Sequence, residues 1–111
     1  GDVERAVLGI TPGRDVLARD EGLAGAVIFS VFATGPAERA GLQGLGVVGK
    51  KYTLGDVIVG IDDHEVRSQS DLYRALEPYR AGDEVEVKVN RPARQGRRNE
   101  TVRVRLVAVA R

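Results

Sequence analysis

Two segments near the end of the chain alternate strictly between apolar and polar residues. In EVEVKVN (residues 84–90) the valines at 85, 87 and 89 fall on one face, and TVRVRLVAV (residues 101–109) continues the pattern through Val102, Val104 and Leu106. A period of two predicts strands with one buried and one solvent-facing side. Residues 91–100, which contain four arginines and Gly96, are expected to join these strands as a hairpin loop. The chain must therefore build a layer that covers the valine face.

The segment SQSDLYRALEPY (residues 68–79) is the best candidate for that cover. Its apolar residues recur at helical spacing, at Leu72, Ala75, Leu76 and Tyr79. Either Ser68 or Ser70 can cap the start of this helix. A shorter helix is expected within TGPAERAGL (residues 34–42), because Pro36 suits a first helical turn and Gly41 suits a helix end. Residues 14–20 are expected to form one or two further helical turns.

The remaining segments complete a mainly β fold. Strands are expected over residues 5–10, 25–33 and 56–62, and a glycine-rich loop over residues 43–54. Together the patterns predict five or six short strands with one long and one short helix. The predicted fold class is α+β, mainly β: a partly open antiparallel barrel or sandwich, formed by residues 1–111 as a single domain.

Composition excludes several classes of function. The absence of Cys excludes disulfides, a thiolate nucleophile and zinc–thiolate sites, and no cofactor is expected. A net charge of +1 gives no global field that calls for nucleic acid or a membrane. No apolar run approaches the ~20 residues that span a bilayer, and no signal peptide is visible.

One stretch imitates a nucleotide-binding motif. GLGVVGKK (residues 44–51) contains G-x-G-x-x-G and nearly matches a phosphate-binding loop. Such loops need a strand before them and a helix after them. Here a helix precedes and a strand follows, and Lys51 stands where the magnesium-binding hydroxyl would be. We therefore interpret the stretch as an excursion between helix and strand.

Enzymatic, metal and nucleic-acid sites are also disfavoured. The only histidine, His64, lies in a polar turn, and no serine has the glycine-flanked turn of a hydrolase nucleophile, so no catalytic residue is assigned. Asp62, Asp63 and His64 are adjacent, and adjacent residues on a tight turn rarely converge on one metal ion. The arginines of the C-terminal fifth lack interleaved aromatics for base stacking and have glutamates beside them. Nucleic acid is therefore a minor alternative partner.

The stretch AVLGITPG (residues 6–13) is the strongest functional signal. Gly9 interrupts an apolar run, and a glycine inside a strand indicates either a bulge or the close approach of another backbone. Pro12 and Gly13 then break the run.

Five collinear segments resemble the PDZ domain that follows the protease domain of HtrA-type (Deg-type) serine proteases. They are VLGI (7–10), GPAERAGL (35–42), LGDVIVGIDDHEV (54–66), SQSDLYRALEPYRAGDEVEVKVNR (68–91) and TVRVRL (101–106). The resemblance implies a non-catalytic regulatory module that binds peptides or unfolded protein C-termini. It also implies a protease domain before residue 1, contacts with that domain or other protomers, a role in protein quality control, and an extracytoplasmic location such as the periplasm.

The same resemblance implies the site residues. The backbone N–H groups of Leu8, Gly9 and Ile10 would hold a peptide carboxylate, and the peptide would lie between the following strand and the long helix. Ile10, Leu76 and Leu8 would form an apolar pocket for the last peptide side chain, while Leu72, Ala75 and Tyr79 would face the core. The implied carboxylate-binding loop is Val7, Leu8, Gly9 and Ile10, and the implied groove is Thr11, Pro12, Gln69, Tyr73 and Leu76.

Pro12 departs from the family pattern. It stands where the family donates a backbone N–H to the bound peptide, and proline has none. We therefore expect weak or short-footprint peptide binding. A standalone scaffold or oligomerisation PDZ domain remains the alternative.

Overall fold

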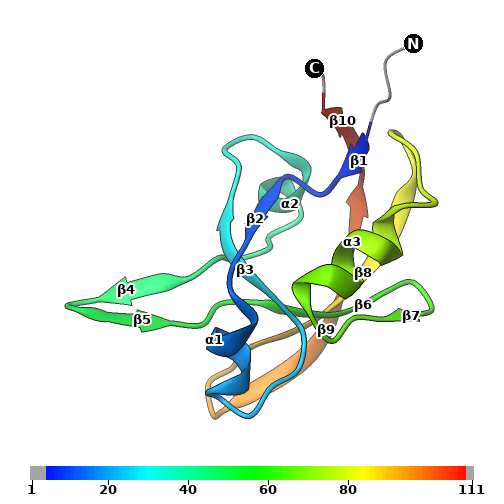
Figure 1. The fold of residues 1–111 in the computed structure, drawn as a ribbon. Coiled ribbons are helices and arrows are strands. Elements are labelled where there is room, and N and C mark those ends of the chain that lie inside the picture. Colours follow the sequence, from blue (N-terminus) through cyan, green and yellow to red (C-terminus); the bar gives the residue numbers. More distant parts are fainter. Residues whose placement is uncertain (1–4, 110–111) are drawn as a thin grey trace.

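The computed structural model describes residues 5–109 and is mainly β (Figure 1). Its principal sheet is antiparallel, with strand order β2-β3-β6-β8-β9 and β7 paired to β6. The sheets stay open, as expected of a partly open barrel or sandwich. The strands of the principal sheet are β2 (Ile10–Pro12), β3 (Ala26–Val31), β6 (Val57–Ile61), β7 (His64–Glu65), β8 (Glu84–Pro92) and β9 (Arg97–Arg105).

Two smaller ladders and three helices complete the described fold. Strand β1 (Arg5–Val7) pairs antiparallel with β10 (Val107–Val109), so the two ends of the described chain lie side by side (Figure 1). Strands β4 (Gly46–Val48) and β5 (Lys51–Thr53) form a separate hairpin. The helices are α1 (Asp15–Arg19), α2 (Pro36–Arg39) and α3 (Gln69–Leu76).

The helix predictions are confirmed. Helix α3 starts after Ser68, whose Oγ accepts a hydrogen bond from the Asp71 N–H at 3.1 Å, so Ser68 rather than Ser70 is the cap. Pro36 opens α2, and Gly41 follows it with a φ of +87°, a conformation that glycine adopts without a steric penalty.

The alternating valines form the core as predicted. Val85, Val87 and Val89 are buried against α3 and β6, together with Val104 and Leu106. A second, smaller cluster under α1 contains Ala18, Val27, Leu54 and Val57.

Two predicted loops are strands in the structure. Residues 91–100 were expected to form a loop, but β8 and β9 pair continuously from Glu84↔Arg105 to Pro92↔Arg97 and leave only residues 93–96 as the turn. The expected glycine-rich loop over 43–54 is the β4–β5 hairpin, with Val47 opposite Tyr52 and Val48 opposite Lys51. In both segments, cross-strand pairs outweigh a composition typical of loops.

The predicted strand over 5–10 is interrupted. It divides into β1 and β2 because Gly9 adopts a φ of +82°, which no regular strand contains. This interruption lies beside the candidate site.

Candidate functional site

A groove of about 680 Å³ runs between β2 and α3. Its walls are predominantly apolar. The side chains or backbone of the following residues line it: Arg5, Ala6, Val7, Leu8, Gly9, Ile10, Pro12, Phe32, Leu72, Tyr73, Leu76, Glu77, Tyr79 and Val109.

The loop between β1 and β2 brings backbone N–H groups to the lining of the groove. The carbonyl of Leu8 accepts from the Ala37 N–H at 3.0 Å, and that of Gly9 accepts from the Phe32 N–H at 2.9 Å. Within the described residues, no acceptor is found for the N–H of Leu8 or Gly9. Backbone N–H groups that converge around a left-handed residue form a site for an anion. The loop can therefore hold a carboxylate without a cationic side chain.

Both the backbone conformation and the space available at position 9 require glycine. Its φ of +82° lies in the left-handed region, where a Cβ is strained. A Cβ built there would also lie 3.0 Å from Cδ of Pro36, at the start of α2. The close contact between this loop and α2 thus fixes the direction of the loop's N–H groups.

Strand β2 forms one wall and offers a free backbone edge. The Gly9 carbonyl and the Gly13 N–H both bond to residues on the β3 side, the latter to Val27 at 2.8 Å. Because backbone groups of alternate residues point in opposite directions, those of Ile10 and Pro12 face away from β3, towards α3. Ile10 can donate and accept there, whereas Pro12 can only accept.

Helix α3 forms the other wall. Leu76 is half-buried and Tyr73 half-exposed along the groove, while Leu72 and Ala75 are buried in the core as predicted. Leu8 lines the groove too, although it is only 1% exposed and forms its floor. Leu8, Ile10 and Leu76, the three residues expected to form the apolar pocket, thus line one cavity.

Two of the expected groove residues lie outside its lining. Thr11 is exposed on the opposite face of β2 from Ile10 and Pro12. The Gln69 N–H donates to Asp15 Oδ1 at 2.9 Å and ties α3 to α1, and its Nε2 lies 3.4 Å from the Tyr73 hydroxyl. Their contact with a peptide remains a prediction.

A polar contact that the sequence did not indicate anchors the end of α3. Tyr79 packs against the main core, as expected, but it also lines the groove. Its hydroxyl donates to Asp62 Oδ2 at 2.5 Å, and the Glu86 N–H donates to Asp62 Oδ1 at 2.7 Å. The bond to Asp62 raises the pKa of Tyr79 to about 12, and the same bond, with that from Glu86, lowers the pKa of Asp62. This contact holds the groove wall to the β6–β7 turn.

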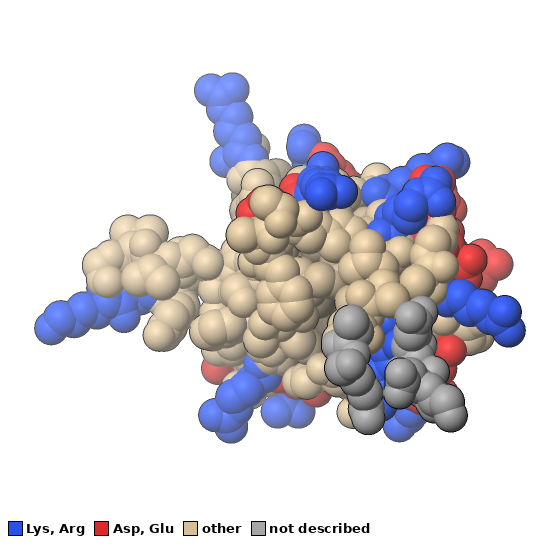
Figure 2. All heavy atoms as spheres, turned by 90° about the horizontal axis from the view of Figure 1, so that it is seen from above, with Lys and Arg blue, Asp and Glu red and all other residues tan. Residues whose placement is uncertain are grey.

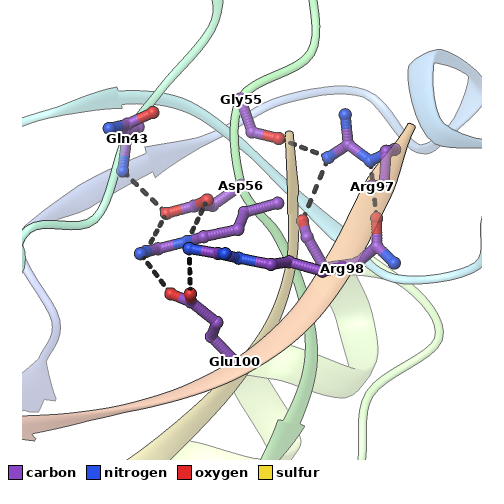
Figure 3. A network of polar contacts seen from close by, with 8 residues as sticks. Gln43, Gly55, Asp56, Arg97, Arg98 and Glu100 are labelled. Carbon is purple, nitrogen blue, oxygen red and sulfur yellow. Dashed lines mark hydrogen bonds and ion pairs between the residues drawn. The ribbon is translucent and has the colours of Figure 1, made fainter. Parts of the chain in front are cut away.

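Two of the C-terminal arginines, Arg91 and Arg97, are bound within the fold. Figure 3 shows the polar network around Asp56 and Arg97. Asp56 is fully buried and accepts two hydrogen bonds from Arg91, at 2.9 and 3.1 Å, and one from the Gln43 N–H. Glu100 pairs with both Arg91, at 2.7 Å, and Arg98. Arg97 donates to the carbonyl oxygens of Gly55 and Asn90. Arg91 and Arg97 thus tie the β8–β9 hairpin to the segment just before β6, whereas the side chains of Arg98, Arg103 and Arg105 are 64–72% exposed beside glutamates.

Three observations on the described part of the chain concern the other chemistries considered. Residues 5–109 contain no group of three or more His, Cys, Asp or Glu side chains arranged to hold a metal ion. His64 is exposed on β7. None of the three helices in this region is long and apolar enough to cross a membrane.

Comparison with known proteins agrees with this geometry. A family model described as a PDZ domain matches residues 2–106. The chain is 38% identical over 92 residues to Protease Do-like 1, chloroplastic, of Arabidopsis thaliana, and 38% identical over 69 residues to Protease Do-like 8, chloroplastic, of the same plant. These matches cover 82% and 60% of this chain but only 21% and 15% of the relatives.

Solved structures show the same fold. Two structures of the HtrA-type protease AlgW with a decapeptide, one of them a variant, align with TM-scores of 0.72 at 27% and 26% identity. The alignments cover 99% and 98% of this chain and 31% of the AlgW chains. The groove, the interrupted strand and the match across nearly the whole sequence lead to one assignment: the chain belongs to the PDZ domain family and is homologous to part of the HtrA/Do-like proteases.

Proposed function

We propose that this domain binds the C-terminal end of a peptide in the groove between β2 and α3. The observation that carries the proposal is the pair of backbone N–H groups at Leu8 and Gly9, two residues that line an apolar groove and whose N–H groups have no acceptor among the described residues. A terminal carboxylate supplies acceptors for those donors, and the adjoining chain can add to the free edge of β2 as an extra strand.

The groove favours an apolar final side chain. Ile10 and Leu76 face each other across the cavity, and Leu8 forms its floor, so a small or medium apolar side chain displaces water from apolar surface only. The charged residues of the lining, Arg5 and Glu77, carry opposite signs. The specificity of the site is therefore set chiefly by the carboxylate and by the apolar pocket.

Pro12 limits the length of peptide that is recognised. The last peptide residue lies opposite Ile10 and can exchange two hydrogen bonds with it. The third residue from the end lies opposite Pro12 and finds an acceptor but no donor. The ladder is thus incomplete after its first rung, and residues further from the C-terminus add little to affinity.

The whole protein is proposed to be a serine protease that this domain regulates. Its relatives are Do-like proteases, and AlgW is an HtrA-type protease whose structures hold a decapeptide. Unfolded protein C-termini are the proposed ligands, with the protease domain and other protomers as further partners. By the same relationship we propose a role in protein quality control outside the cytoplasm, in the cell envelope or an equivalent compartment.

Fluorescence anisotropy with a labelled peptide tests this function. A peptide that ends in Val or Ala is compared with the same peptide as its C-terminal amide. We expect saturable binding of the free acid and at least tenfold weaker binding of the amide, because hydrogen bonds to a charged group contribute about 1.5–3 kcal/mol. Equal affinities for the two peptides would exclude carboxylate recognition.

A further inference from the structure

The β4–β5 hairpin projects from the body of the domain as an arm, residues 46–53 (Figure 1). Its root is anchored: the Leu45 N–H donates to the Phe29 carbonyl at 3.0 Å, and Leu54 is buried in the cluster under α1. The segment beyond the root carries three large apolar side chains that are mostly exposed, Val47 at 65%, Val48 at 70% and Tyr52 at 67%. The peptide groove uses none of them.

Both faces of the arm carry exposed apolar side chains. Val47 lies directly opposite Tyr52, so these two side chains share one face of the ribbon, while Val48 lies on the other face opposite Lys51. A folded protein that docks on a two-stranded ribbon covers one face and leaves the other in water. Apolar side chains on both faces favour an environment that surrounds the tip.

The charged residues of the arm are all positive. Residues 43–55 contain Lys50 and Lys51 and no Asp or Glu, although the whole chain is nearly neutral. Figure 2 shows the arm on the left as tan atoms, with blue, positively charged atoms at its outer end and no red atoms on it. The tip combines aliphatic side chains with a tyrosine and two lysines. This combination suits the interface of an anionic bilayer, where aromatic side chains lie at headgroup level and lysines reach the phosphates.

We propose that the arm inserts its tip into the interface of membranes that contain anionic lipid. Val47 and Tyr52 lie two strand residues from the Gly49–Lys50 turn, about 7 Å at 3.3 Å per residue, which is within the ~5–10 Å depth of interfacial insertion. At that depth headgroup water can still bond the free edges of the ribbon. The membrane contact leaves the peptide groove open and does not depend on the function proposed for it.

The experiment uses single tryptophan reporters, because the chain contains no Trp. Val48→Trp places a reporter at the tip, and Val107→Trp on β10 is the control at another exposed valine. Each protein is mixed with vesicles of phosphatidylcholine alone or with about a third phosphatidylglycerol. We expect a blue shift for the tip reporter with anionic vesicles only and no shift for the control.

Charge variants test the same contact by co-sedimentation with the anionic vesicles. Replacing Lys50 and Lys51 with Gln is expected to weaken partitioning about 25-fold, since each lysine near such a surface contributes about fivefold. The matched control, Lys88→Gln with Arg94→Gln, removes the same charge from other exposed sites and should change partitioning by about twofold or less.

Three results would overturn the proposal. They are the absence of partitioning into anionic vesicles, an equal loss in the control charge variant, and a blue shift of the tip reporter that depends on protein concentration without vesicles. The last result would assign the arm to contacts between copies of the chain.

Discussion

Replacing Pro12 with Ala should restore the missing rung of the peptide ladder. The new N–H points away from β3, because the Gly13 N–H and the Gly9 carbonyl on either side bond towards β3. It therefore meets the carbonyl of the third peptide residue from the C-terminus. A hydrogen bond of this kind contributes about 1 kcal/mol net, which corresponds to about fivefold tighter binding. Loss of the proline ring should lower the stability of the free domain by about 0.4–1 kcal/mol.

The assay is a binding cycle with two peptides that share an apolar free-acid terminus. One peptide has normal amides, and the other has the carbonyl of its third residue from the end replaced by methylene. Pro12→Ala should bind the normal peptide about fivefold more tightly than the parent domain does and the reduced peptide no more tightly. An equal gain for both peptides, or a gain for neither, would refute the proposed strand pairing.

Three further changes probe the supports of the groove and the fold. Gly9→Ala should lower the free energy of unfolding by at least about 1–2 kcal/mol, because a Cβ is strained at a φ of +82° and meets Pro36 at 3.0 Å. The same variant should no longer bind peptide. A chemical denaturation curve that matches that of the parent would contradict the stability prediction. Asp56→Ala leaves Arg91 without its buried partner and should lower the free energy of unfolding by about 3 kcal/mol. Arg103→Gln removes an exposed side chain 3.5 Å from Glu84 and should lower it by less than about 0.5 kcal/mol. Similar losses for the two variants would show that the buried and the exposed pair do not differ in strength. Tyr79→Phe should flatten the pH dependence of stability at both ends. The lowered pKa of Asp62 contributes stability above pH ~4 that is lost as the pH falls below that value, and the raised pKa of Tyr79 contributes stability below pH 10 that is lost as the pH rises towards about 12. If thermal melts of the variant and the parent showed the same pH dependence, the Tyr79–Asp62 contact would not form.

The elements set by local patterns were predictable from the sequence. The alternating valines fixed the buried face of β8 and β9, and the helical spacing of Leu72 and Ala75 fixed the face of α3 that packs on it. Gly9 could also be recognised, because a glycine within an apolar strand indicates either a bulge or close backbone approach. In the structure it is a left-handed residue, and a Cβ added there would meet Pro36.

The features that depend on distant partners could not be predicted in this way. Arg91 and Arg97 give their segment the composition of a solvated loop, yet they bond to Asp56 and to the Gly55 carbonyl, which follow the β4–β5 hairpin in sequence. The Tyr79–Asp62 bond joins residues 17 apart, so it forms only when α3 packs beside the β6–β7 turn. The glycines of residues 43–54 led to the prediction of a loop where the β4–β5 hairpin forms, although its Val47–Tyr52 pair is typical of strands.

The most direct test of the central claim is an NMR titration of the backbone amides with an apolar peptide and its C-terminal amide. The account predicts large shifts of the Leu8, Gly9 and Ile10 amide signals with the free acid and much smaller shifts with the amide. Equal shifts for the two peptides, or no shift at these three residues, would contradict carboxylate recognition by this loop.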